Sequence, residues 1–189
     1  MSLVLYHNGV LSADRRTANP TAGDDSYDGL ENYSKLFVSE DKTFLTGCCG
    51  YIPSPKELLA LKSCLDALSN DKDAKVDLME RFVRSDAAKD FWRKHVVMFM
   101  FYAGRFLLIK KDEDLETPTA SEKGLIVPTY IECDLDQTRI TGSGRPAGVV
   151  LLRSGQDIPL DRFYRIVSSC CEGVSTRYDT IPLNQIKGF

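Results

Sequence analysis

Residues 2–16, SLVLYHNGVLSADRR, place a complete β-hairpin at the start of the chain. Leu3–Tyr6 and Val10–Ala13 are short runs of β-type residues. The Asn-Gly pair between them is the strongest short signal for a tight hairpin turn. A carboxylate, Asp14, follows the second run directly. The sequence therefore predicts an antiparallel β-hairpin at the N-terminus.

A second hairpin follows after residues 17–33, which contain several glycine, proline and aspartate residues and no apolar period. We interpret that segment as an excursion loop. Lys35–Val38 and Thr43–Gly47 then form two further β-type runs, turned at 39–42. Four strands are thus expected in the first fifty residues.

Two helices are expected next. Ser54, Pro55 and Glu57 form a capping box with a proline in the first turn, so a helix begins there. Its buried face carries leucines at helical spacing, Leu58, Leu61, Leu65 and Leu68. Apolar residues from Val76 to Val83 mark a second helix that reaches Trp92.

The second half of the chain predicts another β block, one or two helices and closing strands. The strand runs are His95–Tyr102, Arg105–Lys110, and Leu125–Val127 with Tyr130–Glu132, around a charged, solvated loop at 111–123. Gly142-Ser143-Gly144 leads into a short apolar segment, and a last helix starts at 158–160 and ends by Gly173. Ser175–Ile181 and Gln185–Phe189 are expected as closing strands.

Strand blocks separated by helix pairs favour an α+β fold of four layers, with two antiparallel sheets between two layers of helices. A chain of 189 residues with 43% hydrophobic residues can build one core, so we expect one domain spanning residues 1–189.

The composition limits the partners. A net charge of -3 gives no reason to expect nucleic acid or an anionic membrane. The N-terminus lacks the features of a secretory signal, and no apolar run is long enough to span a bilayer. A cytosolic protein is expected, with no nucleic-acid and no membrane partner.

The sequence gives little support for a metal site or an organic cofactor. No two of the six cysteines have the spacing of a zinc turn, which favours buried free thiols. His7 and His95, the two histidines, are expected to be structural, so a Ser-His-Asp triad is improbable. No phosphate loop or dinucleotide fingerprint is present. The sequence predicts no metal and no organic cofactor.

The order of these motifs resembles the active-site half of proteasome-type N-terminal nucleophile (Ntn) hydrolases, including proteasome β-subunits and HslV-like proteins. The resemblance covers most of the chain and implies the four-layer sandwich. In that family the first residue of the mature chain attacks a peptide carbonyl, and its own α-amino group, with a pKa near ~8, acts as the base. Here Ser2 takes that place once Met1 is removed. A chain that starts Met-Ser is also ordinary.

The resemblance also implies supporting roles. Lys35 matches the lysine beside the nucleophile, and Asp14 matches the carboxylate that orients this lysine. Arg16 matches an arginine that fixes the adjoining loop. Gly50 resembles the oxyanion donor, and Ser143 the serine that binds the terminal amine. The alternatives remain a surface lysine, a strand-ending aspartate and a flexible Gly-Ser-Gly turn.

Three further positions complete the comparison with that family. Cys48 and Cys49 are expected to flank the pocket for the substrate residue before the scissile bond, or to be small core residues. The family's acidic residue near the end of the last long helix has no clear match, and Glu172 is the only acidic side chain there.

The leading hypothesis is a cytosolic Ntn peptidase that needs no cofactor and acts on peptides or unfolded proteins. The resemblance implies a homo-oligomer of rings or stacked rings, often served by an ATP-dependent unfoldase, with 58–68 and 76–83 as candidate contact faces. The alternative is a catalytically inactive, proteasome-like assembly or scaffold protein, which retention of Met1 would favour.

Overall fold

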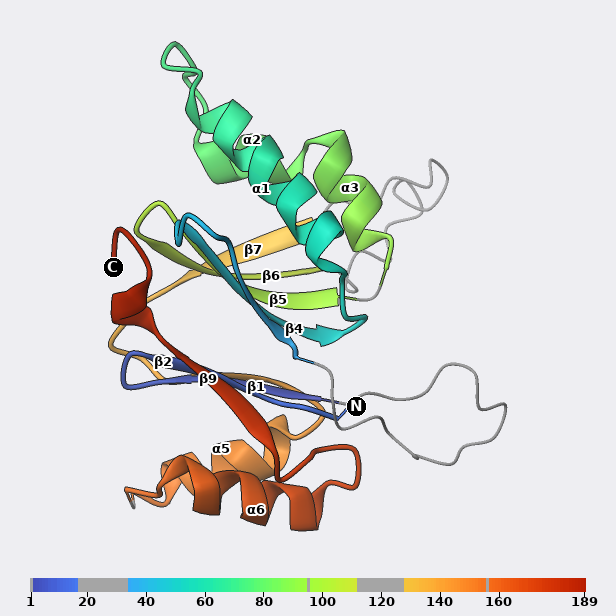
Figure 1. Cartoon of the computed structure of the whole chain (residues 1–189), viewed down its shortest axis with the longest axis vertical. Helices are drawn as coiled ribbons and strands as arrows, with labels where there is room; N and C mark the ends of the chain where they lie inside the picture. The colour runs from blue at the N-terminus through green and yellow to red at the C-terminus, as the bar shows by residue number, and fades with distance from the viewer. Residues whose placement is uncertain (1, 17–33, 95, 112–127, 156) are drawn as a thin grey trace.

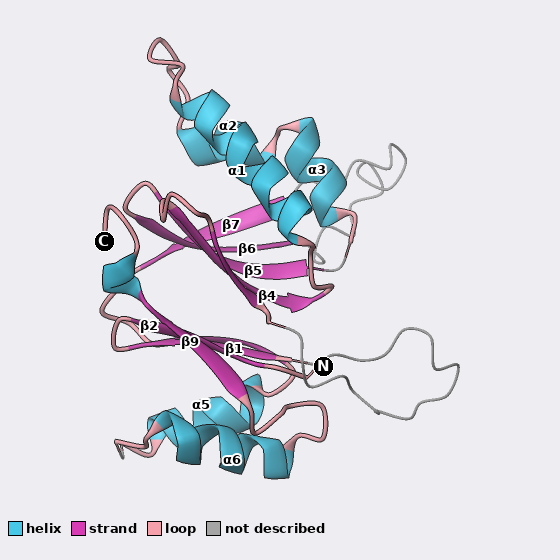
Figure 2. Cartoon of the chain, in the orientation of Figure 1, coloured by secondary structure: helices cyan, strands magenta, loops and turns pink. Residues whose placement is uncertain are grey.

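Two antiparallel sheets lie face to face, and helices cover the outer side of each (Figure 1). The computed structural model describes residues 2–16, 34–94, 96–111, 128–155 and 157–189. Figure 2 shows the resulting sequence of layers as helix, strand, strand, helix, with the start of β1 at the end of the first sheet marked N. The predicted four-layer α+β sandwich is confirmed. The predicted excursion loop at 17–33 lies outside the described residues, as does most of the charged loop at 111–123.

The first sheet has the strand order β8-β1-β2-β9. Its strands are β1 (Leu3–His7), β2 (Val10–Asp14), β8 (Arg139–Gly142) and β9 (Tyr178–Pro182). The opening hairpin is as predicted: Asn8 and Gly9 have φ of 49° and 74°, the left-handed pair that a tight hairpin turn requires. β8 was not predicted, because its four residues include only one large apolar side chain, Ile140. Pairing with β1 makes it a strand.

The second sheet has the order β3-β4-β5-β6-β7. Its strands are β3 (Leu36–Val38), β4 (Phe44–Gly50), β5 (Val96–Tyr102), β6 (Arg105–Lys111) and β7 (Pro128–Cys133). The two predicted hairpins are confirmed, although β4 runs three residues beyond its predicted end at Gly47. Cys48 and Cys49 are therefore strand residues whose side chains point to opposite faces of the sheet.

Three helices, α1 (Pro55–Ser69), α2 (Leu78–Val83) and α3 (Asp86–Trp92), cover the second sheet (Figure 1). The capping box at Ser54 and Glu57 is present as predicted. The single helix expected from Val76 to Trp92 was wrong. The chain breaks at Arg84, and Ser85 caps α3 by accepting a hydrogen bond from the Ala88 amide.

Helices α5 (Arg145–Arg153) and α6 (Leu160–Cys170) cover the first sheet, and a short 3-10 turn, η1 (Leu183–Gln185), follows β9. The predicted closing strand at Gln185–Phe189 was wrong. Proline at 182 has no N–H to continue a ladder, and the chain turns so that Leu183 and Ile186 enter the core between the sheets. Within the described residues, no helix is long and apolar enough to cross a bilayer.

The hydrophobic core consists of three clusters: one between the second sheet and its helices, one between the two sheets, and one between the first sheet and its helices. Aromatic side chains fill the space between the sheets, where the Phe101 and Phe106 rings stack with centroids 4.3 Å apart. The apolar stripes predicted at 58–68 and 76–83 pack onto the second sheet and are mostly buried. Val76 in the second stripe is exposed, as is Leu59 beside the first, and a contact between subunits at these helices stays a prediction.

Candidate active site

Ser2 lies at the start of β1, the strand that pairs with both β2 and β8, and is only 4% exposed. Its backbone N–H donates to Ser143 Oγ at 3.0 Å. The Ser143 hydroxyl in turn donates to the Ser2 carbonyl at 3.3 Å, and the Gly144 amide approaches the same carbonyl at 3.5 Å. The Gly-Ser-Gly segment after β8 therefore holds the backbone of Ser2 on both its nitrogen and its oxygen. Once Met1 is removed, that nitrogen becomes the α-amino group.

Gly142 allows this close approach. Its φ is +99°, a conformation that L side chains rarely adopt, and a Cβ added there would lie 2.1 Å from the Ser2 carbonyl oxygen. The same Cβ would lie 3.1 Å from the sulfur of Cys49. A glycine is thus required for β8 to lie against the candidate nucleophile.

Asp14 is a fully buried carboxylate that connects four parts of the site. Its Oδ1 accepts from Lys35 Nζ and from the Leu3 amide, each at 2.6 Å. Its Oδ2 accepts from the amides of Arg16 at 3.1 Å and Ser175 at 3.2 Å. Four donors compensate the cost of burying the charge. Asp14 thereby connects β1, the chain just after β2, the residue before β3 and the segment after α6.

Lys35 is equally buried, and its ion pair with Asp14 has both side chains at 0% exposure. Burial lowers the pKa of Lys35 below its ordinary value of 10.5, and the Asp14 carboxylate opposes that shift without cancelling it. The Cys49 thiol lies in the same environment: burial raises its pKa to about 11, while a hydrogen bond with Ser2 and the Lys35 charge act in the opposite direction. The buried Lys35 cation therefore has Asp14 and Cys49 as neighbours, and Ser2 lies next to Cys49.

The Gly50 amide points at the hydroxyl of Ser2. Its N–H donates to Ser2 Oγ at 3.4 Å, and Gly50 is exposed at the end of β4 with φ of +79°. A backbone donor next to an attacking oxygen is the arrangement that stabilises a developing oxyanion.

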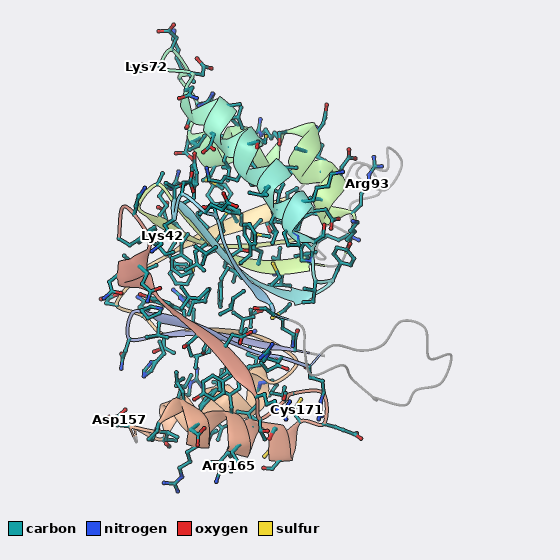
Figure 3. All side chains as sticks on the ribbon, in the orientation of Figure 1. Lys42, Lys72, Arg93, Asp157, Arg165 and Cys171 are labelled. Carbon is teal, nitrogen blue, oxygen red and sulfur yellow. The ribbon has the colours of Figure 1, made fainter. Side chains whose placement is uncertain are left out.

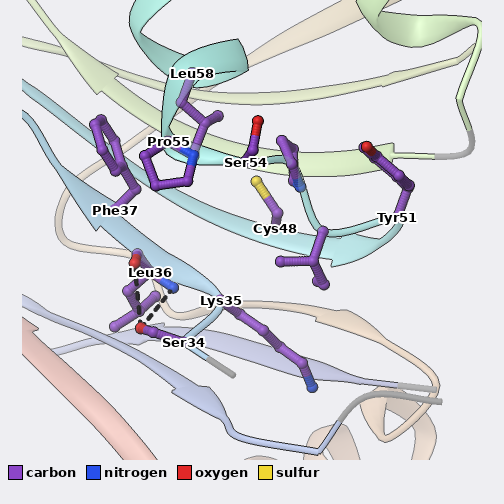
Figure 4. A pocket seen from close by; sticks show the side chains of 11 residues that line it. Ser34, Lys35, Leu36, Phe37, Cys48, Tyr51, Ser54, Pro55 and Leu58 are labelled. Atoms are coloured by element: carbon purple, nitrogen blue, oxygen red, sulfur yellow. Dashed lines mark hydrogen bonds between the residues drawn. The ribbon is translucent and has the colours of Figure 1, made fainter. Parts of the chain in front are cut away.

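A cavity of about 430 Å³ opens beside this site, between β3, the end of β4 and the start of α1. Figure 4 shows Phe37, Cys48 and Leu58 around it, with the Lys35 side chain extending away from them. The two cysteines expected to flank the pocket separate here: Cys48 lines the cavity, whereas Cys49 faces Ser2 and the space between the sheets. Adjacent strand residues cannot both face one side of a sheet.

The segment after α6 closes the site from the other side. Cys171 Sγ lies 4.0 Å from Ser143 Oγ. Glu172, the one acidic side chain that sequence reasoning could offer here, is exposed, and its backbone carbonyl accepts from Arg16 Nη1 at 2.5 Å. Arg16 thus contacts this segment, and its role in fixing a loop of the site stays a prediction.

Sequence reasoning missed Ser175 and the contact made by Cys171. Ser175 is fully buried and supplies one of the four donors to Asp14. Its position two residues beyond Gly173, just after a helix end, was the only local signal. Both contacts join residues more than twenty positions apart, which no local pattern reveals.

The other titratable candidates lie elsewhere. His7 Nδ1 bonds to Thr138 Oγ1 at 2.6 Å at the hairpin end, a structural contact as predicted, and His95 lies outside the described residues. All six cysteines are free. Cys48, Cys49 and Cys133 are buried as expected, but Cys170 is exposed. In the described ranges no group of three metal-ligating side chains gathers.

Comparisons with known proteins find similarity in structure but not in sequence. No family model matches the chain, and no curated protein matches it. HslV from Trypanosoma brucei aligns with a TM-score of 0.54 at 16% identity, over 95% of this chain and 97% of that one. Anbu from Hyphomicrobium sp. strain MC1 aligns with a TM-score of 0.51 at 17% identity, over 95% and 80%. Thiobacillus denitrificans BPH, in complex with epoxomicin, aligns with a TM-score of 0.50 at 12% identity, over 95% and 96%.

At these identities the likeness is one of fold, and it covers nearly the whole chain. The predicted resemblance to proteasome-type proteins is confirmed at that level. With two helix-covered antiparallel sheets and structural neighbours that include HslV and Anbu, the chain has a proteasome β-subunit-like fold.

Proposed function

We propose that this protein is an Ntn amidohydrolase that cleaves peptide bonds with Ser2 as its nucleophile, after removal of Met1. The observation that carries the proposal is the placement of Ser2 itself: its nitrogen lies 3.0 Å from Ser143 Oγ, and its hydroxyl lies 3.4 Å from the Gly50 amide nitrogen. Nitrogen, nucleophilic oxygen and oxyanion donor therefore belong to one compact group.

The α-amine of a processed Ser2 would act as the base. Ser143 Oγ accepts one N–H of that amine and leaves its lone pair available for the Ser2 hydroxyl proton. As Ser2 Oγ bonds to the substrate carbonyl carbon, the carbonyl oxygen takes the negative charge and accepts the Gly50 N–H. The amine then returns its proton to the leaving nitrogen as the C–N bond breaks. Water hydrolyses the resulting ester by the same steps, which frees Ser2.

Lys35 supplies a fixed positive charge beside the nucleophile. Asp14 holds Lys35 Nζ at 2.6 Å, so the charge cannot move away during the reaction. A nearby cation lowers the pKa of the terminal amine and favours ionisation of the Ser2 hydroxyl. The same Asp14 oxygen binds the Leu3 amide, so the carboxylate positions both the lysine and the residue next to the nucleophile.

The cavity lined by Phe37, Cys48 and Leu58 would receive the side chain that precedes the scissile bond. Its side-chain wall is largely apolar, and Lys35, which also lines it, directs its ammonium away from Phe37, Cys48 and Leu58 (Figure 4). No carboxylate lines it among the described residues, so a basic substrate side chain would lack a partner. We therefore expect a preference for apolar side chains such as leucine or phenylalanine over lysine.

The fold likeness supports a proposal about assembly, and the cytosolic location rests on the sequence alone. We propose a homo-oligomeric ring or stacked rings in the cytosol, taking peptides or unfolded proteins as substrates, with an ATP-dependent unfoldase as a possible partner. Size measured by sedimentation tests the ring: a monomer at micromolar concentration contradicts this part of the proposal.

The proposed activity is tested with fluorogenic peptides ending in leucine or in lysine. Processed protein should cleave the leucine peptide faster, and Ser2→Ala should lower the rate by about 10³-fold or more. Ser168→Ala, on the surface of α6, is the matched control and should leave the rate unchanged. Full activity in Ser2→Ala contradicts the assigned nucleophile. Inactivity of protein that has lost Met1 supports the alternative of an assembly or scaffold protein.

A further inference from the structure

A second groove lies between the edge strand β8 and the second sheet, and none of its lining residues belongs to the cavity beside Phe37. It encloses about 650 Å³, with β8 and α5 forming one wall and β5, β6 and β7 the other. We call it the β8 groove. Its volume falls in the range of ligand-binding clefts.

Strand register places one end of the β8 groove next to Ser2. Val97 pairs with Cys49 on one side and with Lys110 on the other. On the opposite wall Gly142 pairs with Leu3 and touches the Ser2 carbonyl. The groove therefore begins beside the candidate nucleophile and follows β8 away from it, toward Arg139.

The lining is basic in a chain whose net charge is -3. Its charged members are Lys110, Arg139, Arg145 and Arg153, and no carboxylate lines it. None of the four forms an ion pair within the part of the chain that the structure describes. Arg139 Nε is buried without a hydrogen-bond partner there, although Nη2 donates to Gln137 Oε1 at 2.6 Å. Four unpaired cations around one groove are complementary to an anionic ligand.

The floor between these charges is apolar. Phe99, Leu108 and Ile140 contribute to it, and Ile131 is a large apolar side chain left 51% exposed. A ligand must therefore offer apolar groups as well as negative charge.

The backbone of β8 adds a third requirement. β8 is the first strand in the order of its sheet and pairs only with β1, so its other edge is unpaired among the described strands. An unpaired strand edge can accept an extended peptide as one more strand. Side chains of such a strand alternate between two faces, one toward the apolar floor and one toward α5, which carries Arg145 and Arg153.

We propose that the β8 groove binds an extended polypeptide segment in which acidic and apolar residues alternate. The apolar side chains would lie on the floor at Leu108 and Ile131, the carboxylates would bind Arg145 and Arg153 on α5, and the backbone would pair with the free edge of β8. Arginine suits this role because its planar guanidinium binds carboxylates through two hydrogen bonds. The proposal concerns a surface outside the Ser2 site and does not depend on catalysis.

Binding is measured by fluorescence anisotropy with the full chain carrying Ser2→Ala, so that no hydrolysis can interfere whatever the activity. The probe is a capped, dye-labelled hexapeptide of alternating glutamate and valine, and the control peptide alternates lysine and valine. The double variant Arg145→Glu/Arg153→Glu, on the α5 side of the groove, should weaken glutamate-peptide binding about tenfold. Lys72→Glu, at the tip between α1 and α2 and far from α5 (Figure 3), is the matched control and should change nothing. Circular dichroism verifies that each variant is folded.

Saturable binding of the glutamate peptide that falls in the double variant, weakens with added salt and is absent for the lysine peptide supports the proposal. Equal affinity for both peptides, or no loss in the folded double variant, overturns it. Absence of binding to the glutamate peptide also overturns it. If oleate instead occupies the groove while the peptide does not, the site is one for anionic amphiphiles and the peptide proposal is wrong.

Discussion

Gly142→Ala should lower the free energy of unfolding, because the added Cβ would clash with the backbone of Ser2. A comparison of Gly142 with Gly9 gives the size of the effect. Gly142 has φ of +99°, and an added Cβ would lie 2.1 Å from the Ser2 carbonyl oxygen and 2.8 Å from the Ser2 carbonyl carbon. Both are backbone atoms, so no side-chain rotation relieves the clash. Gly9 has φ of +74° but no atom within 4 Å of an added Cβ. Gly9→Ala therefore isolates the cost of the backbone conformation alone.

The left-handed conformation costs an L residue about 1–2 kcal/mol. Forcing extra volume into a packed site adds about 1–3 kcal/mol. We expect Gly9→Ala to lower the free energy of unfolding by the first amount, and Gly142→Ala to lower it by about 2–5 kcal/mol, the sum of both. Urea denaturation followed by circular dichroism gives both values under the same conditions. Equal losses for the two variants would refute the close packing of β8 against Ser2.

Three further predictions concern buried groups. Burial raises the pKa of the Cys49 thiol from 9.0 to about 11. The thiol of the unfolded chain therefore ionises at a lower pH than the buried one, so the folded protein loses stability as the pH rises from about 9 to about 11. Between those pH values the free energy of unfolding of Cys49→Ala should fall by about 2 kcal/mol less than that of the parent, measured by urea denaturation. Lys35→Met leaves the Asp14 charge buried without its cation and should cost about 3–5 kcal/mol, with partial recovery when Asp14→Asn is added. A loss below about 1 kcal/mol in thermal unfolding would contradict a buried pair. Tyr164→Phe removes a buried hydroxyl that donates to Ser12 Oγ at 2.9 Å and should cost about 1 kcal/mol in calorimetry, and an unchanged midpoint would contradict that bond.

Local signals were sufficient for the elements whose ends carry their own chemistry. The Asn-Gly turn predicted the first hairpin, and the capping box at Ser54 predicted the start of α1. β8 was not predicted because it becomes a strand through pairing with β1, which lies 130 or more positions away in the chain. The break between α2 and α3, at Arg84 and Ser85, was not predicted because the apolar period continues across it. Tertiary pairing and capping decide both cases, and neither is visible in hydrophobic periodicity.

The candidate site was predicted mainly through family resemblance, and the structure shows why composition alone could not reveal it. Asp14 and Lys35 meet across 21 positions, and Ser2 and Ser143 meet across 141. The pairing of β1 with β8 brings Ser2 to Ser143, and the packing of one sheet on the other brings Lys35 to Asp14, so both contacts depend on the fold as a whole. The opposite orientations of Cys48 and Cys49 could have been predicted from strand alternation once both were known to lie on β4. The donor at Ser175 could not.

The terminal nucleophile is tested most directly by the intact mass of protein purified from its native setting, before and after treatment with an electrophilic β-lactone. We predict a mass that lacks Met1, one covalent adduct after treatment, and peptide mapping of that adduct to Ser2. Ser2→Ala should remain unmodified under the same treatment. Quantitative retention of Met1 with no adduct would contradict the peptidase and leave an assembly protein on a hydrolase fold.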